Sequence, residues 1–476
     1  MNRHRLILFF AILVKLVLQF ALVLPEYELH RDEFLHIDQG KHLAWGYVSV
    51  PPLTSWTSWL VLQFGAPELL VRLIPALWGA ATLVLIYKMV KLLGGNAFAL
   101  SLALSCAVFS GLMRLNMLYQ PNSADVFFWT LLFYLLMAYS KWRTDKYLYF
   151  TALAFAFGML NKYNIAILAL SLFAGLAVAG PRHIFFEKHL YLAAALALAI
   201  LLPHLYWQFS NHFPVIAHMA ELRETQLINV DRMDFIKDQI LFFAGAIWVV
   251  AAGLIALSRP ESREFRFIPV AFVTALLLFT LMRAKGYYAV GLYPVLLAAG
   301  AVAFGKLRNR VLRAALLIFP ALLFAAIVDV AFPLRSAQFI AQNPGNYQKL
   351  GMLTWEDGKQ HALPQDFADM LGWKELAQKV SAATNNLSGS TLILCDNYGQ
   401  AGAINYYAPG RNAVSRNADY VNWFPRGKID HVIWVREAQN AHPRETLGKF
   451  RIVRRAGKIE NPYARESGST IYLLKE

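Results

Sequence analysis

Long apolar segments recur along most of this chain and are separated by short polar turns. A membrane-spanning helix needs roughly 20 consecutive, mostly apolar residues, and about eleven segments approach that length. They cover residues 6–24, 67–87, 96–116, 124–140, 147–161, 164–180, 189–208, 236–257, 267–283, 287–304 and 311–332. The pattern predicts a polytopic α-helical membrane domain over residues 1–332.

The pattern becomes polar from about Pro333. Short apolar runs at 391–395, 431–435 and 471–474 are typical of strands, and 366–382 has a helical pattern. The segment that follows the first strand has too few glycines for a dinucleotide site and lacks a P-loop lysine, so a turn that opens a helix is expected there. We therefore expect a small α/β domain outside the membrane over residues 333–476.

The first loop, residues 25–66, carries two further helix signals. Asp32 can cap a helix that runs to about Trp45. Residues 53–64 are too few to span a bilayer, and two tryptophans three positions apart suit a helix at headgroup depth. We expect two surface-lying helices in this loop.

Composition and charge agree with a membrane protein. The 476 residues are 57% hydrophobic and only 16% charged, whereas a soluble domain carries about a quarter charged residues. The net charge of +15 does not indicate nucleic-acid binding, because Lys and Arg accumulate in the cytoplasmic loops of membrane proteins.

The positions of these basic residues predict the orientation. If the chain has eleven spans, one side receives the basic groups at 3–5, 88–91, 141–146, 182–188, 259–266 and 306–313, and that side is the cytoplasm. The opposite side receives the loops 25–66 and 209–235, the turns 117–123, 161–164 and 283–288, and the C-terminal domain.

Asp32 and Glu33 follow the first span directly. Carboxylates at a bilayer edge are costly, which makes them candidate site residues. Neighbours on a helix diverge by about 100° and cannot both serve one proton, so one would face the substrate and the other would support structure. The alternative is helix capping by Asp32, with Glu33 favouring the helix N-terminus.

Asp125, at the outer start of the span 124–140, brings a second carboxylate to the same face, although capping explains it equally well. Asp32 and Asp125 together could bind a divalent metal ion or divide base and orienting roles. The histidines show no zinc-binding spacing with a matching third ligand, so no zinc site is assigned.

Lys and Arg normally accumulate in cytoplasmic loops, so basic residues on the outer face are unexpected and become candidate site residues. Beside Tyr and Gly they suit a phosphate at headgroup depth, and the alternative is snorkelling to lipid headgroups. The phosphate-binding candidates are Lys162, Arg283, Lys285, Tyr287 and Tyr288, and the substrate-binding candidates are Tyr163, Arg223 and Glu224. For the last two, ion pairing among Glu221, Arg223 and Glu224 is the default explanation.

These features together resemble the membrane glycosyltransferases of the GT-C type, close to the protein O-mannosyltransferase and aminoarabinose transferase families. The similarity rests on the segments 31–33, 46–53, 161–163, 221–225, 284–288, 363–373 and 397–402. It extends over essentially the whole chain. One departure is that Ser49-Val50 precede Pro51, where aminoarabinose transferases carry an acidic and a basic residue; this argues against that particular enzyme.

The resemblance implies a GT-C fold of about eleven transmembrane helices with a small C-terminal periplasmic α/β domain, in the bacterial inner membrane. It implies transfer of a sugar from a polyprenyl-phosphate donor to an acceptor at the periplasmic face, with inversion. The acceptor would be lipid A or the lipopolysaccharide core, another envelope glycan or glycolipid, or a protein. By analogy Asp32 is the base, and the phosphate leaves toward Lys162, Arg283 or Lys285.

Two alternatives belong to other classes of protein. A transporter or flippase for lipid-linked substrates tends to show repeat symmetry and broken helices at the bilayer midplane. Here the polar residues gather at one face, and no repeat is visible. A non-catalytic scaffold that keeps the fold is the other alternative.

Overall fold

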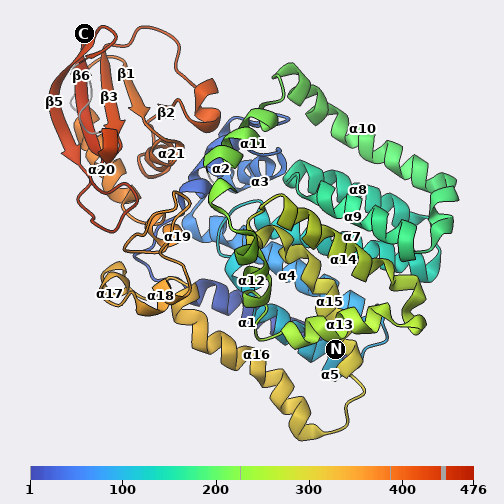
Figure 1. Ribbon diagram of the computed structural model, residues 1–476. Helices are drawn as coiled ribbons and strands as arrows, with labels where there is room; N and C mark the ends of the chain where they lie inside the picture. Colours follow the sequence, from blue (N-terminus) through green and yellow to red (C-terminus); the bar gives the residue numbers. More distant parts are fainter. Residues whose placement is uncertain (1, 226, 386, 441–445) are drawn as a thin grey trace. The chain divides into compact units, whose positions relative to one another are not determined.

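The computed structural model describes residues 2–225, 227–385, 387–440 and 446–476 (Figure 1). Packing divides the chain into two compact units. The first unit contains Met1–Leu22, Val50–Leu53 and Arg72–Phe332, and the second contains Val23–Ser49, Thr54–Val71 and Pro333–Glu476. The second unit thus includes the polar C-terminal region together with most of the first loop.

The first unit is helical. Its elements are α1 (Arg3–Ala21), α4 (Glu68–Leu92, whose first residues belong to the second unit), α5 (Ala97–Val108), α6 (Gly111–Leu115), α7 (Asn122–Trp142), α8 (Lys146–Asn161), α9 (Ile165–Ala179), α10 (Lys188–Ser210), α11 (Pro214–Thr225), α12 (Arg232–Leu241), α13 (Ile247–Ser258), α14 (Phe267–Leu281), α15 (Tyr293–Phe304) and α16 (Arg310–Ala331). The 3-10 turns are η1 (Arg182–Phe186), η2 (Leu227–Asn229), η3 (Pro260–Phe265) and η4 (Gly286–Leu292).

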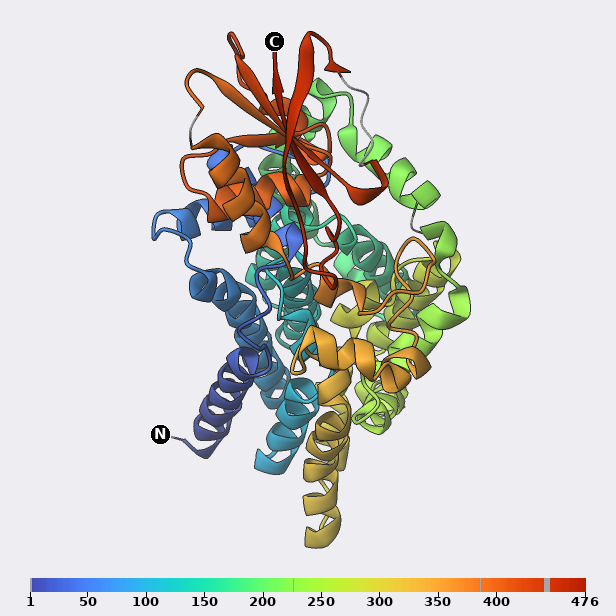
Figure 2. The same cartoon turned by 90° about the vertical axis from the view of Figure 1, so that its left-hand side faces the viewer.

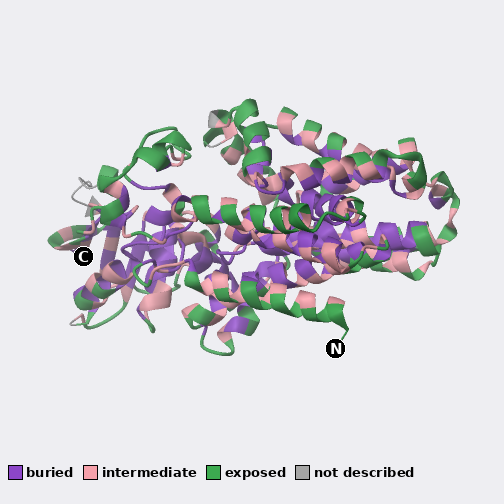
Figure 3. Cartoon of the chain, turned by 90° about the horizontal axis from the view of Figure 1, so that it is seen from below, coloured by how far each residue is buried: buried purple, intermediate pink, exposed green. Residues whose placement is uncertain are grey.

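Within the described part of the chain, six helices are long and apolar enough to cross a membrane, and four shorter helices are also apolar. The count of eleven spans therefore stays a prediction. Helices α1 and α16, which stand out in Figure 2, expose large apolar side chains such as Phe9 and Leu322. Such exposure is expected of helix faces that contact lipid. Figure 3 shows the complementary pattern, with buried residues gathered between the helices.

Three predicted spans differ from the structure. The segment 96–116 is broken into α5 and α6, because the Ser110 side chain caps a new helix at the Leu112 amide. The segment 236–257 is divided into α12 and α13. The segment 287–304 begins as the 3-10 turn η4 and becomes α-helical only at Tyr293. Apolar content predicted these segments, but not the local breaks within them.

Small residues allow the helices to pack closely. A Cβ on Gly253 in α13 would lie 2.2 Å from the Leu296 carbonyl oxygen of α15, and one on Gly300 would lie 1.9 Å from that of Val249. Close approach at small residues is typical of membrane helix pairs. Lys15 and Gln19 face into the bundle: both are 3% exposed, and the Lys15 Nζ donates to Gln19 Oε1 at 2.8 Å.

The second unit is built on a mixed sheet of order β2-β1-β3-β6-β5-β4. Its strands are β1 (Thr391–Cys395), β2 (Ala413–Ser415), β3 (His431–Arg436), β4 (Thr446–Leu447), β5 (Phe450–Lys458) and β6 (Thr470–Lys475). Strand β1 is parallel to β2 and β3, whereas β6 is antiparallel to β3 and β5. The three predicted strands are confirmed. The other three were missed, two of them because they are short.

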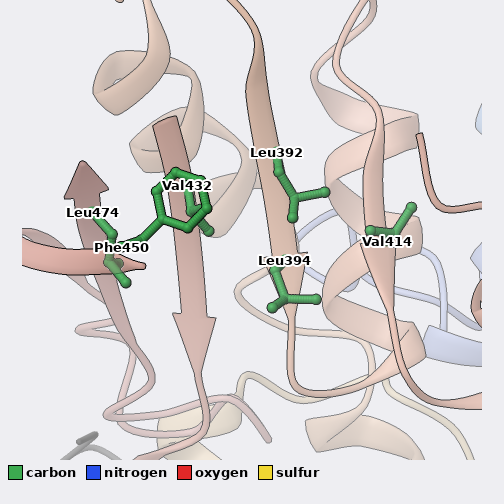
Figure 4. Packing of buried hydrophobic residues seen from close by; sticks show 6 residues of the cluster. All are labelled: Leu392, Leu394, Val414, Val432, Phe450 and Leu474. Atoms are coloured by element: carbon green, nitrogen blue, oxygen red, sulfur yellow. The ribbon is translucent and has the colours of Figure 1, made fainter. Parts of the chain in front are cut away.

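The sheet has two different faces. On one face, alternate residues of the strands form the apolar cluster of Figure 4, which contains Leu392, Leu394, Val414, Val432, Phe450 and Leu474. Helices α20 (Trp373–Thr384) and α21 (Tyr398–Tyr407) pack against each other and against strands of the sheet. Asn397 caps α21 through the Gln400 amide, which confirms the predicted turn into a helix.

The remaining elements of this unit are α2 (Arg31–Lys41), α3 (Leu53–Leu62), α17 (Ala337–Gln342), α18 (Gly345–Lys349), α19 (Gln365–Ala368), η5 (Ala418–Asn422) and η6 (Ala438–Asn440). The two helices expected in the first loop are therefore present, although α2 ends at Lys41. The single helix expected over 366–382 is wrong. It is divided into α19 and α20, because Gly372 has a φ of +83° and α20 starts after it.

Helix α2 lies against α21 at a glycine. A Cβ on Gly402 would lie 2.6 Å from the Phe34 Cβ and 2.7 Å from the Tyr420 hydroxyl. Both are closer than packed carbon and oxygen atoms approach, so no larger residue fits without a shift of α2. This contact fixes how closely α2 can approach α21.

We expect Gly402→Ala to destabilise the protein by about 1–3 kcal/mol, as overpacking of a core does. A loss of stability is informative here, because replacing glycine by alanine in a helix interior normally stabilises a protein. Thermal unfolding of the detergent-solubilised chain measures the effect. Gly345→Ala in α18 is the matched control, since a Cβ there meets nothing within 4 Å. Equal stability of the two variants would show that α2 and α21 are not in close contact.

Candidate functional site

The N-terminus of α2 is capped by His30 and not, as expected, by Asp32. The His30 Nδ1 accepts from the Asp32 amide at 3.2 Å, and the Glu33 Oε2 accepts from the His30 amide at 2.6 Å. Glu33 is 1% exposed and is part of this capping box. The two acids therefore have different structural roles. The Glu33 side chain belongs to the cap of α2, whereas the Asp32 side chain takes no part in capping.

The Asp32 side chain points toward α21. Its Oδ1 accepts from the Tyr398 hydroxyl at 2.6 Å, and the side chain remains 32% exposed. Burial alone would raise the pKa of this carboxyl, but His30, Arg31 and the Tyr398 hydroxyl outweigh it and lower the pKa to about 2. Asp32 is consequently a carboxylate over the whole physiological pH range.

His30 is buried in a set of charges. Its Nε2 lies 3.5 Å from Asp369 Oδ2 and 4.0 Å from Asp366 Oδ1, and its Nδ1 lies 3.9 Å from Asp32 Oδ2. Burial opposes the charged ring, but Asp32 and Asp369 outweigh it and raise the pKa of His30 to about 9. Asp369 also accepts from Arg465 Nη1 at 3.1 Å. These acids therefore favour the protonated ring. A protonated Nδ1 cannot accept a hydrogen bond, so the cap from His30 to the Asp32 amide belongs to the neutral ring.

The second half of α2 is anchored by buried polar groups that sequence reasoning did not identify. Asp38 is 2% exposed and accepts from Asn405, Tyr420 and Lys41 at 2.7, 2.7 and 2.8 Å. Gln39 donates to Asp419 Oδ2 at 2.7 Å. These bonds hold α2 in one register and thereby position its N-terminus.

A second cluster lies in the first unit, around the turn between α8 and α9. The Lys162 Nζ donates to Asn122 Oδ1 at 2.6 Å and lies 5.0 and 4.3 Å from the ring centroids of Tyr287 and Tyr288. The Asn164 amide donates to Asp125 Oδ2 at 2.9 Å. Three predicted phosphate-binding residues are thus brought together, and Asp125 lies beside the same turn.

The other predicted residues are distributed differently. Tyr163 is tied to α10, because its hydroxyl contacts His204 Nε2 at 3.0 Å and accepts from Gln208 at 2.8 Å. Arg283 is exposed and donates only weakly, to the Ile228 carbonyl at 3.4 Å. Lys285 precedes η4 as its N-cap.

Arg223 and Glu224 are exposed on α11, and within the described residues neither forms an ion pair. Glu221 instead lies 3.9 Å from His218. The expected ion pairing among these three residues is therefore absent from the described structure.

The residues present do not fit a divalent metal ion. Among the described residues no group of three His, Cys, Asp or Glu side chains is arranged to hold one. The Asp32 Oδ1 accepts from the Tyr398 hydroxyl, and the Asp125 Oδ2 accepts from the Asn164 amide. No metal-dependent step is derived below.

Comparison with known proteins identifies the fold. The chain has an ArnT-like fold of the GT-C type, and its several apolar helices agree with a multi-pass membrane protein. The resemblance drawn from the sequence is thereby confirmed. A model of the family described as dolichyl-phosphate-mannose-protein mannosyltransferase matches residues 49–207.

Individual relatives are as follows. ArnT from Cupriavidus metallidurans, bound to undecaprenyl phosphate, has a TM-score of 0.66 at 14% identity over 98% of this chain and 97% of that one. The oligosaccharyltransferase of Archaeoglobus fulgidus, in complex with Zn and sulfate, has a TM-score of 0.52 at 13% identity over 90% and 68%. The lipopolysaccharide core galacturonosyltransferase RgtB of Rhizobium johnstonii is 33% identical over 223 residues. That match spans less than half of either protein, 44% of each.

The charge on His30 predicts a pH dependence of stability. The pKa of His30 is raised in the folded state, so its contribution is complete below the unfolded value of about 6.5 and is lost as the pH rises through about 9. We expect the wild-type chain to lose up to roughly 3 kcal/mol across this window. In His30→Asn, which keeps a capping side chain, the loss should be much smaller.

Thermal unfolding between pH 6 and 9.5 measures this difference. His361→Asn serves as a control, because His361 is an exposed histidine that pairs with Asp357 at 3.1 Å. If wild type and His30→Asn lose stability in parallel, His30 is not the group responsible.

Proposed function

We propose that this protein transfers a sugar from a polyprenyl-phosphate donor to lipid A or the lipopolysaccharide core at the periplasmic face of the inner membrane, with inversion. The fold shared with ArnT bound to undecaprenyl phosphate and the name of the RgtB relative support this. The observation that carries the proposal is Asp32, a carboxylate kept ionised and about one-third exposed in a fold shared over 98% of the chain.

Asp32 is proposed as the base. In the transfer, the acceptor oxygen bonds to the anomeric carbon, the bond from that carbon to the phosphate oxygen breaks, and the acceptor proton passes to Asp32. A carboxylate with a pKa of about 2 is a weak base. It suits a dissociative, oxocarbenium-like transition state, in which the hydroxyl becomes acidic as it bonds to carbon, so that the base receives the proton late.

Lys162 is proposed to bind the donor phosphate. The electron pair of the broken bond ends on this group, and a fixed ammonium stabilises the developing charge. An ammonium has three donors, of which one goes to Asn122. Tyr287 and Tyr288 flank it, and Arg283 and Lys285 are proposed as further cations for the same phosphate. Tyr163, Arg223 and Glu224 remain proposed substrate contacts, and Asp125 is proposed to orient the turn that carries Lys162.

Asp32→Asn should abolish transfer, with a loss of at least about 100-fold, because the amide cannot accept the proton. Mass spectrometry of lipopolysaccharide from cells that lack the gene, complemented with wild type or variant, measures this. Asp366→Asn is the matched control, since Asp366 is 52% exposed and lies at the edge of the same cluster. Full sugar addition by Asp32→Asn would exclude Asp32 as the base.

Lys162→Met should weaken the binding of undecaprenyl phosphate by roughly 10- to 100-fold, the usual value of a hydrogen bond to a charged group. Binding of uncharged undecaprenol should not change. Lys146→Met provides a matched control, because Lys146 lies 5.3 Å from the Tyr147 ring at the other end of α8. An unaltered affinity of Lys162→Met for the phosphate would remove Lys162 from the site.

A further inference from the structure

Arg31 stands out among the charged residues near Asp32. It lies in the first turn of α2, and its guanidinium carbon is 4.3 Å from the Tyr398 ring centroid. Within the described chain the guanidinium donates no hydrogen bond and forms no ion pair, and its Nε is buried. A buried guanidinium Nε without an acceptor is unusual, because a desolvated donor is costly when it is left unpaired.

The neighbouring acids do not need Arg31 as a hydrogen-bond donor. Asp369 is engaged by His30 and Arg465. Glu466 accepts three hydrogen bonds from neutral donors, at 2.9 Å from Asn397, 2.5 Å from Gln400 and 2.9 Å from Ser469. The positive charge of Arg31 lowers the pKa of the Asp32 and Asp369 carboxyls without a hydrogen bond to either. Its hydrogen-bonding capacity remains available.

A planar guanidinium with five donors matches a carboxylate, which it binds through two parallel hydrogen bonds. Stacking on Tyr398 holds the group in place without neutralising it. Because Arg31 and Asp32 contact the ring and the hydroxyl of the same Tyr398, a sugar that reacts at Asp32 lies close to Arg31. We propose that Arg31 binds the carboxylate of a uronic-acid residue in the reacting sugars and so makes the enzyme selective for an acidic sugar. This inference rests on the proposed function.

The carboxylate has two sources, the donor sugar and the acceptor glycan. Purified full-length protein is given undecaprenyl phosphate–galacturonic acid or undecaprenyl phosphate–galactose, which differ only in a carboxylate against a hydroxymethyl group. Each is tested with lipopolysaccharide from the deletion strain and with the same material after chemical reduction of its carboxyl groups. Rates of sugar transfer are measured for wild type, Arg31→Met, Arg31→Lys and Arg465→Met.

We expect wild type to prefer the carboxylate-bearing substrate by roughly 10- to 100-fold in kcat/KM. Arg31→Met should lose this preference, and Arg31→Lys should keep only part of it, because an ammonium lacks the planar fork. Arg465→Met should keep the preference, since Arg465 is paired with Asp369. If Arg31→Met loses selectivity between the two donors, Arg31 binds the carboxylate of the donor sugar. If it loses selectivity between the two acceptors, Arg31 binds a carboxylate of the acceptor glycan.

A purely structural role would lower transfer of all substrates by the same factor, and that result, or full selectivity in Arg31→Met, would overturn the inference. The ratio between substrates is internal to each variant, so a partly unfolded variant does not obscure it. Should no donor be used at all, the proposed function fails. Binding of methyl galacturonoside against methyl galactoside, measured by saturation-transfer NMR on the full chain, then still decides whether Arg31 binds a carboxylate.

Discussion

Helix α2 carries Asp32 and Asp38 against α21, and hydroxyl and amide donors from that part of the fold satisfy both carboxylates. Tyr398 serves Asp32, while Asn405 and Tyr420 serve Asp38. A buried carboxylate without such partners would cost several kcal/mol. The two acids are six positions apart, so both sets of bonds can form in only one register of α2. Every group at the N-terminus of α2 depends on this register.

The charges at that N-terminus alternate in sign, which explains how an acid and an imidazolium coexist there. His30 lies between Asp32 and Asp369, and Arg465 balances Asp369 from the other side. Each group shifts the pKa of its neighbours toward the charged form, and together they outweigh the effect of burial. Asp32 is therefore always ionised and able to accept a proton, but it is a weak base. It accepts the proton only when the reaction has made that proton acidic.

The sequence predicted what depends on local composition and missed what depends on distant partners. Apolar length located the helices of the first unit, and apolar runs located three strands, but the caps at Ser110 and the break at Gly372 were overlooked. Asp32 was identified, yet capping was assigned to it because Asp is a more common cap than His. Tyr398, which donates to Asp32, and Asp369, which pairs with His30, are more than 300 positions away from α2 along the chain, and no pattern in a single sequence pairs such residues.

Lys162 and Arg31 differ from the cations that pair directly with carboxylates. Lys41, Lys379 and Arg465 each lie within 3.1 Å of a carboxylate oxygen, and such pairs carry no net charge. Lys162 and Arg31 instead lie against tyrosine rings, and among the described residues neither has a carboxylate oxygen within 4.0 Å, although acids lie close enough to feel their charge. An aromatic ring contributes about 0.5–2 kcal/mol to holding a cation and leaves its positive charge intact. Both cations therefore keep hydrogen-bonding capacity for a further anion, which is the property on which their proposed roles toward a phosphate and a sugar carboxylate rest.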